Sequence, residues 1–142
     1  MKKLLITTDS FPPRYDGVSK FLSEIIPRLS KKFKITVIAP DYGEISIKNV
    51  NIIKIPTSRI TIAGYTLPRI YIDLIKKEIE KNDIIFNNTI GPIGIISIFY
   101  SSRIKKPIFS YVHSIEWELF SEAIALPIFI KKQIKLTTKK LA

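Results

Sequence analysis

The sequence contains no cysteine and a single histidine, His113. Without cysteine the chain cannot form disulfides, thiolate zinc sites or a cysteine nucleophile, and one histidine excludes a metal site built from several imidazoles. Acidic residues are also scarce, with 12 Asp and Glu against 23 Lys and Arg, so the formal net charge is +11. That surplus favours anionic partners such as nucleic acid, anionic lipid or phosphorylated ligands, although a solvated lysine-rich surface is the simpler explanation.

Long apolar runs are missing as well. The first six residues resemble the start of a signal peptide, but Asp9 ends their apolar run too early. The longest uncharged run, residues 84–102, contains Asn, Gly and Pro, and it predicts a strand, a turn and a helix rather than a membrane span. We therefore expect a cytoplasmic globular protein, and 142 residues that are 46% hydrophobic suffice for one domain with a core.

The stretch from Leu4 to Val18 organises the rest of the prediction. It begins as a buried strand, passes through a turn rich in Pro with Asp9 at its start, and ends at Gly17, where an amphipathic helix begins. In an open parallel sheet such a loop lines the ligand crevice, and the helix start offers unpaired N–H groups that suit an anion. Asp9 and Asp16 are interpreted as turn-forming residues.

Strand and helix patterns alternate along the chain, which predicts a Rossmann-like, doubly wound parallel α/β sheet of about five strands in the order 3-2-1-4-5. Residues 57–67 are expected to be a loop, and Pro68 is expected to open the second helix. The third helix is apolar nearly all round and should be well buried. The predicted strands are 4–6, 33–39, 50–55, 84–86 and 107–112, and the predicted helices are 17–32, 68–79, 91–103 and a terminal segment in two pieces over 116–142.

No strand follows that terminal segment, so we expect residues 1–142 to be one truncated domain. Three loops should converge on the crevice between the first and fourth strands, namely 9–17, 87–91 and 113–117. His113 could bond a substrate hydroxyl or transfer a proton, and Asn88 could meet a polyol. Glu116 could orient a ligand or cap a helix. Neither the dinucleotide-binding glycine fingerprint nor the P-loop is present, which argues against NAD binding and ATP hydrolysis.

Three segments carry a family resemblance. Residues 8–19 read TDSFPPRYDGVS, residues 83–91 read DIIFNNTIG, and residues 107–117 read PIFSYVHSIEW. In this order they resemble the opening Phe-Pro-Pro…Gly-Gly-Val turn, the Asp-strand-Gly segment and the strand ending in His of family-4 retaining glycosyltransferases, which have the GT-B fold. The resemblance covers nearly the whole chain.

The resemblance implies the acceptor-side half of a two-domain enzyme that moves a sugar from a nucleotide-sugar to a glycan or lipid acceptor, with retention and without a metal. The donor-binding domain is absent from this sequence, so the chain alone is expected to be inactive. Gly17 and Val18 would approach the donor diphosphate, and His113 would contact the donor sugar near the reaction centre. Asp16 replaces a family glycine and is expected to point toward the acceptor. The other implied acceptor contacts are Phe11, Tyr15, Lys20, Asn88 and Glu116.

The alternative is a non-catalytic basic module that binds anionic membrane or nucleic acid. Steeply salt-dependent binding would favour it, but aromatic residues do not interleave with the basic ones, which makes nucleic acid the weaker choice. Residues 119–140 are apolar and then basic. That pattern suits packing against a segment not in this sequence better than contact with the inner face of a membrane, and an uncovered apolar helix could also drive homodimerisation.

Overall fold

The computed structural model describes residues 1–62, 65–111 and 113. The predicted terminal segment, 116–142, and with it Glu116, lies outside the described residues. Strands and helices alternate as the sequence predicts, with one added pair of strands. The elements are β1 (Lys2–Thr7), α1 (Gly17–Leu29), β2 (Phe33–Pro40), β3 (Val50–Ile55), β4 (Thr57–Ile62), β5 (Tyr65–Pro68), α2 (Ile72–Lys81), β6 (Ile84–Asn87), α3 (Pro92–Arg103) and β7 (Ile108–Ser110).

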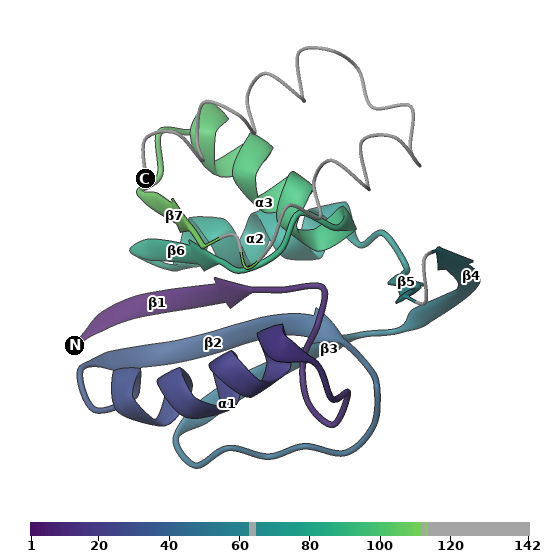
Figure 1. The fold of residues 1–142 in the computed structure, drawn as a ribbon. Coiled ribbons are helices and arrows are strands. Elements are labelled where there is room, and N and C mark those ends of the chain that lie inside the picture. The colour runs from purple at the N-terminus through teal and green to yellow at the C-terminus, as the bar shows by residue number, and fades with distance from the viewer. Residues whose placement is uncertain (63–64, 112, 114–142) are drawn as a thin grey trace.

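Five parallel strands form the main sheet in the order β3-β2-β1-β6-β7. Counted within this sheet alone, that is the predicted order 3-2-1-4-5, and the doubly wound α/β fold is confirmed. Figure 1 shows α1 on one face of the sheet and α2 and α3 on the other. The chain winds outward from β1 in both directions, so the order reverses between β1 and β6. In open α/β sheets ligands bind at such a point, beyond the carboxyl ends of the strands.

The central strand β1 is apolar on both of its faces. Leu4 and Ile6 pack in the cluster beneath α1, while Leu5 packs in the cluster beneath α2 and α3. Successive side chains of a strand point to opposite faces, so a strand covered on both sides must be continuously hydrophobic. The sheet is thereby fixed between two cores, and its carboxyl-end loops are held by a rigid base.

The structure differs from the prediction between residues 57 and 68. This segment contains an antiparallel pair of strands, β4 and β5, where the sequence predicts a loop. Pro68 is the last residue of β5 and does not begin α2. β-branched residues on both sides of Gly64 favour a hairpin, and Pro needs no ladder hydrogen bond at the end of a strand. In Figure 1 this hairpin stands beyond the carboxyl-end edge of the main sheet.

The burial of α3 also differs from the prediction. Phe99 is 49% exposed, and Ile95 and Ile96 are only half-buried. The outer face of α3 therefore borders an apolar groove of about 710 Å³ between α2 and α3, whose lining includes Lys76 and Arg103. None of the described helices is long and apolar enough to cross a membrane.

Candidate functional site

The loop after β1 is anchored from within. The Thr8 hydroxyl donates to the carbonyl of Ser10 at 2.7 Å and accepts from the Ser10 amide at 3.1 Å. Phe11, a predicted acceptor contact, is 1% exposed and packs in the core beneath α1. The ring therefore holds the loop against the sheet and is not exposed to a ligand.

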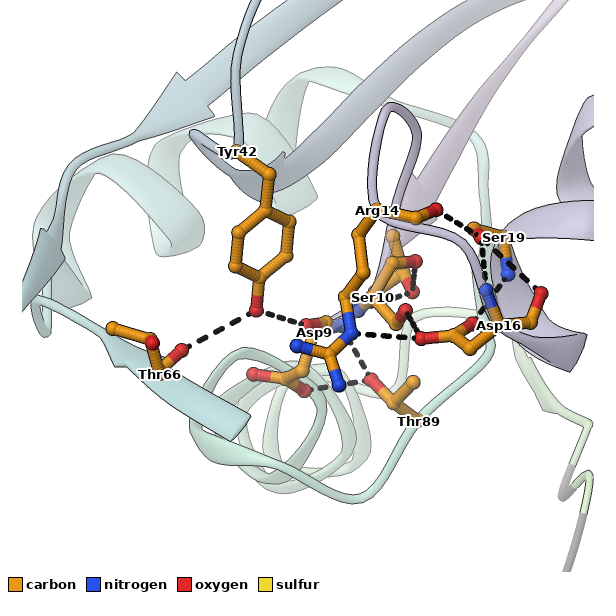
Figure 2. A network of polar contacts seen from close by, with 9 residues as sticks. Asp9, Ser10, Arg14, Asp16, Ser19, Tyr42, Thr66 and Thr89 are labelled. Atoms are coloured by element: carbon orange, nitrogen blue, oxygen red, sulfur yellow. Dashed lines mark hydrogen bonds and ion pairs between the residues drawn. The ribbon is translucent and has the colours of Figure 1, made fainter. Parts of the chain in front are cut away.

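Asp16 caps α1 by a reciprocal pair of hydrogen bonds with Ser19. Its Oδ1 accepts from the Ser19 amide at 2.9 Å, and its own amide donates to the Ser19 hydroxyl at 3.1 Å. Its Oδ2 accepts from the Ser10 hydroxyl and pairs with Arg14 Nε at 2.9 Å. Figure 2 shows these groups turned toward one another within the loop. Asp16 is thus the N-cap of α1, and its carboxylate accepts from one amide of the first turn, that of Ser19.

The pKa of Asp16 reflects two opposing effects. Burial raises it, but hydrogen bonds from Ser10, from the Ser19 amide and from Arg14 outweigh burial and hold the pKa below its ordinary value of 3.8. The Arg14 guanidinium also neutralises the carboxylate charge beside the first turn of α1. An anionic ligand approaching this helix start would therefore meet a paired charge, not an isolated one.

We expect Asp16→Asn to lower the free energy of unfolding by about 1 kcal/mol near neutral pH. Asn caps helices as well as Asp, so the substitution mainly removes the charge. A lowered folded-state pKa stabilises the protein above 3.8, and that contribution is lost as the pH falls through the folded-state pKa. Urea unfolding of both proteins, near neutral pH and at about pH 2, should show the wild-type advantage shrinking in acid. An advantage independent of pH would contradict this.

Gly91 is the N-cap residue of α3, but the carboxylate of Asp9, more than 80 residues away in sequence, accepts from the amides of the first turn of this helix. Its Oδ1 accepts from the Ile93 amide at 2.9 Å. Its Oδ2 accepts from the Gly94 amide at 3.1 Å and from the Thr89 hydroxyl at 2.6 Å. The interpretation as a turn former therefore misses its main contacts. Burial raises the pKa of Asp9, although these donors oppose the shift.

The side chain of Tyr42 connects the loop after β1 to the β4–β5 hairpin. The Tyr42 hydroxyl lies 3.2 Å from the carbonyl oxygen of Asp9 and 3.3 Å from that of Thr66. The Arg14 guanidinium lies over the Tyr42 ring, 5.5 Å from its centroid. The three segments meet in Figure 2, where Tyr42 stands between Asp9 and Thr66. The loop after β1, the loop after β6 and the β4–β5 hairpin are therefore joined beyond the carboxyl ends of the parallel strands, a region that we call the carboxyl-end edge.

Asn88, at the carboxyl-end edge, has a side-chain oxygen that is buried without a hydrogen-bond partner among the described residues. Its amide donates to the carbonyl of Thr7 at 2.9 Å, and its Nδ2 lies 3.3 Å from the carbonyl of Phe86. Its Oδ1 is buried and has no hydrogen-bond partner among the described residues, and the residue is 1% exposed. Phe86 packs against the core beneath α1, and strand alternation puts Asn88 on that same face.

His113 lies on the α1 face as well. Its ring centroid is 4.8 Å from that of Phe21 and 4.6 Å from that of Tyr111, edge-on to both. Phe21 is one helical turn after Gly17. The imidazole is therefore beside α1, the helix that Gly17 begins.

The other predicted residues are spread around this edge. Gly17 lies at the first helical position, has no left-handed φ, and has open space where a Cβ would point. Val18 is buried in the core, Lys20 is exposed, and Tyr15 is 90% exposed. Among the predicted residues, Gly17 begins α1, Asn88 follows β6 and His113 follows β7, and these three define the candidate site. Sequence reasoning missed Phe21 and Tyr111, whose helical and strand patterns indicate only core packing.

The described residues contain no group of three or more His, Asp or Glu side chains that could hold a metal ion. The α2–α3 groove lies on the other face of the sheet from α1, so it is not part of this edge. Comparison with known proteins adds no assignment, since no family model and no curated protein matches the sequence. A function for this chain is therefore inferred from the resemblance of residues 8–19, 83–91 and 107–117 together with the geometry of the described residues.

Proposed function

We propose that this chain is the acceptor-side half of a retaining glycosyltransferase that uses a nucleotide-sugar donor and a glycan or lipid acceptor. The observation that carries the proposal is the buried, unpartnered Oδ1 of Asn88 at the point where the strand order reverses. Leaving such an acceptor unsatisfied costs about 1–3 kcal/mol, so it is expected to have a partner when the protein works. A hydroxyl of a polyhydroxylated ligand is a suitable donor.

The start of α1 supports the donor side of the proposal. The amides of Gly17 and Val18 have no hydrogen-bond acceptor among the described residues, as expected for the first turn of a helix. Open space beside Gly17 lets a ligand come close to the backbone. These two amides would take the donor phosphate, while Arg14 keeps the Asp16 carboxylate from repelling it.

His113 would then contact the transferred sugar. It belongs to the same face as Asn88 and lies beside the helix that Gly17 begins. An imidazole can donate or accept a hydrogen bond near neutral pH, which suits a sugar hydroxyl close to the bond that breaks. Sugar transfer itself would require the donor-binding half. The property of this chain that can be measured is therefore its binding of sugars and nucleotide-sugars.

The single histidine makes the test direct. The imidazole C–H resonances of the 142-residue chain come from one residue, so their shifts report only on His113. We expect them to move when methyl α-D-glucopyranoside, methyl α-D-mannopyranoside or UDP-glucose is titrated in. Shifts that appear with DNA or anionic vesicles but with none of these sugars would favour the basic-module alternative instead.

Asn88→Leu should separate stability from binding. Leu removes the orphaned acceptor and keeps the side-chain size, so the free energy of unfolding should stay the same or rise by up to about 1 kcal/mol. The sugar-induced shifts of His113 should weaken strongly, because the buried acceptor for the hydroxyl is gone. Urea unfolding and the same titration measure both effects.

A matched control is Asn51→Leu, since Asn51 is an exposed amide on β3 at the other side of the sheet. It should leave both stability and the titration close to wild type. If Asn88→Leu binds sugars as well as wild type does, or if no sugar moves the His113 signals in wild type, the proposed site is wrong.

A further inference from the structure

Two aromatic rings at the candidate site are stacked on each other. Phe21 and Tyr111 have centroids 5.0 Å apart and planes only 7° from parallel. Phe21 comes from α1 and Tyr111 follows β7, so the pair joins the helix to the edge strand of the sheet. His113 stands edge-on to both rings, with interplanar angles of 71° and 74°. The three rings form one unit, which we call the aromatic shelf.

The shelf has an open side. Phe21 covers one face of the Tyr111 ring, yet the Tyr111 side chain remains 50% exposed. Its hydroxyl has no hydrogen-bond partner among the residues that the structure describes. A half-exposed ring that is backed by a second ring is already fixed in orientation, so little conformational entropy is lost when a ligand packs on it.

The shelf and the orphaned acceptor belong to one face of the sheet. Asn88 follows β6, Tyr111 follows β7, and these two strands are neighbours paired from Ile85 to Asn87. Tyr111 donates its amide to the carbonyl of Asn87 at 2.9 Å, which continues the ladder beyond the last strand residues. A ligand hydroxyl at Asn88 therefore has an aromatic surface beside it, one strand away.

We propose that Tyr111, backed by Phe21, is a stacking residue for a pyranose ring, and that it makes the site selective for cyclic sugars over open-chain polyols. This inference rests on the proposed function and adds the substrate class of the same site. A pyranose has a face of C–H groups that packs on the electron-rich face of an aromatic ring. An open-chain polyol offers the same hydroxyls without a rigid apolar face.

The test compares each sugar with its open-chain counterpart on the full chain. Methyl α-D-glucopyranoside and D-glucitol, and the corresponding mannose pair, are titrated while the His113 resonances are followed. We expect the pyranosides to bind more tightly than the alditols. Saturation transfer from the protein should be strongest at the C–H groups of one face of the sugar ring.

Tyr111→Leu should weaken pyranoside binding about three- to tenfold, the range of one aromatic contact, and should leave alditol binding unchanged. Tyr111→Phe should keep the wild-type affinity because it keeps the ring. Phe109→Leu is the matched control, since Phe109 is 53% exposed on β7 and lies two residues before Tyr111 on the same face. Circular dichroism of each variant establishes that it is folded.

The outcomes separate the two proposals. Equal binding of pyranosides and alditols, or an unchanged pyranoside affinity in Tyr111→Leu, overturns the stacking role while leaving a polyol site at Asn88 intact. Loss of affinity in Phe109→Leu equal to that in Tyr111→Leu also overturns it, because the effect would then belong to the strand and not to the shelf. Absence of any sugar response in wild type overturns both.

Discussion

Gly94→Ala should destabilise the protein by about 3 kcal/mol or more, a loss in the range that few single substitutions reach. A Cβ at this position would lie 1.9 Å from the carbonyl oxygen of Thr89 and 2.7 Å from its carbonyl carbon. Real Cβ atoms do not approach backbone atoms this closely. The helix α3 and the loop before it would have to separate for the methyl group to fit.

That separation is opposed by contacts on both sides. The Thr89 carbonyl accepts from Nδ2 of Asn87 at 2.7 Å, and the Thr89 hydroxyl is bonded to Asp9. The Gly94 amide donates to Asp9 as well. Moving either segment breaks these bonds and leaves buried polar groups unpaired, which adds to the steric cost.

Gly17→Ala is the control for this prediction. Nothing lies within 4 Å of a Cβ at Gly17, which also begins a helix, so its free energy of unfolding should stay within about 0.5 kcal/mol of wild type. Urea unfolding of both variants gives the comparison. If Gly94→Ala is as stable as Gly17→Ala, the tight approach of α3 to the loop after β6 is not present in solution.

The sheet order followed from the sequence because the physics that sets it is local. Leu4, Leu5 and Ile6 are a continuous apolar run, which requires cover on both faces, and strands separated by helices must be parallel and right-handed. The same rules bring the carboxyl-end loops together. The positions of Gly17, Asn88 and His113 after strand patterns therefore predict, from the sequence alone, that all three lie toward the carboxyl ends of the strands.

Other features depend on partners that are distant in sequence, and no local pattern indicates them. Phe11 follows a strand and precedes two prolines, so it looks like an exposed loop residue, yet its ring fills space beneath α1. The stacking of Phe21 on Tyr111 joins two elements 90 residues apart. The missing partner of Asn88 Oδ1 can be recognised only once every surrounding donor has been placed.

Asp9→Ala should lower the free energy of unfolding by about 3 kcal/mol, because it removes the acceptor for the first turn of α3 and leaves buried donors unpaired. The affected donors are the amides of Ile93 and Gly94 and the hydroxyl of Thr89. The same carboxylate bonds the loop after β1 to the loop after β6 and to the start of α3. Without it, we expect the amides of α3 to exchange hydrogen faster. Urea unfolding and amide hydrogen exchange in α3 measure the two effects.

Asp73→Ala is the matched control, because Asp73 lies exposed in the first turn of α2, and it should change the free energy of unfolding by less than about 0.5 kcal/mol.

The pH dependence of the free energy of unfolding provides a second check on Asp9. Burial raises the folded-state pKa of Asp9 above 3.8, so its contribution to stability falls as the pH rises through that pKa. The gap between wild type and Asp9→Ala should therefore widen in acid, whereas the gap for Asp16→Asn should narrow. If the stability differences for Asp9→Ala and Asp16→Asn both become smaller in acid, then burial does not raise the pKa of Asp9, and its carboxylate is not desolvated as the structure indicates.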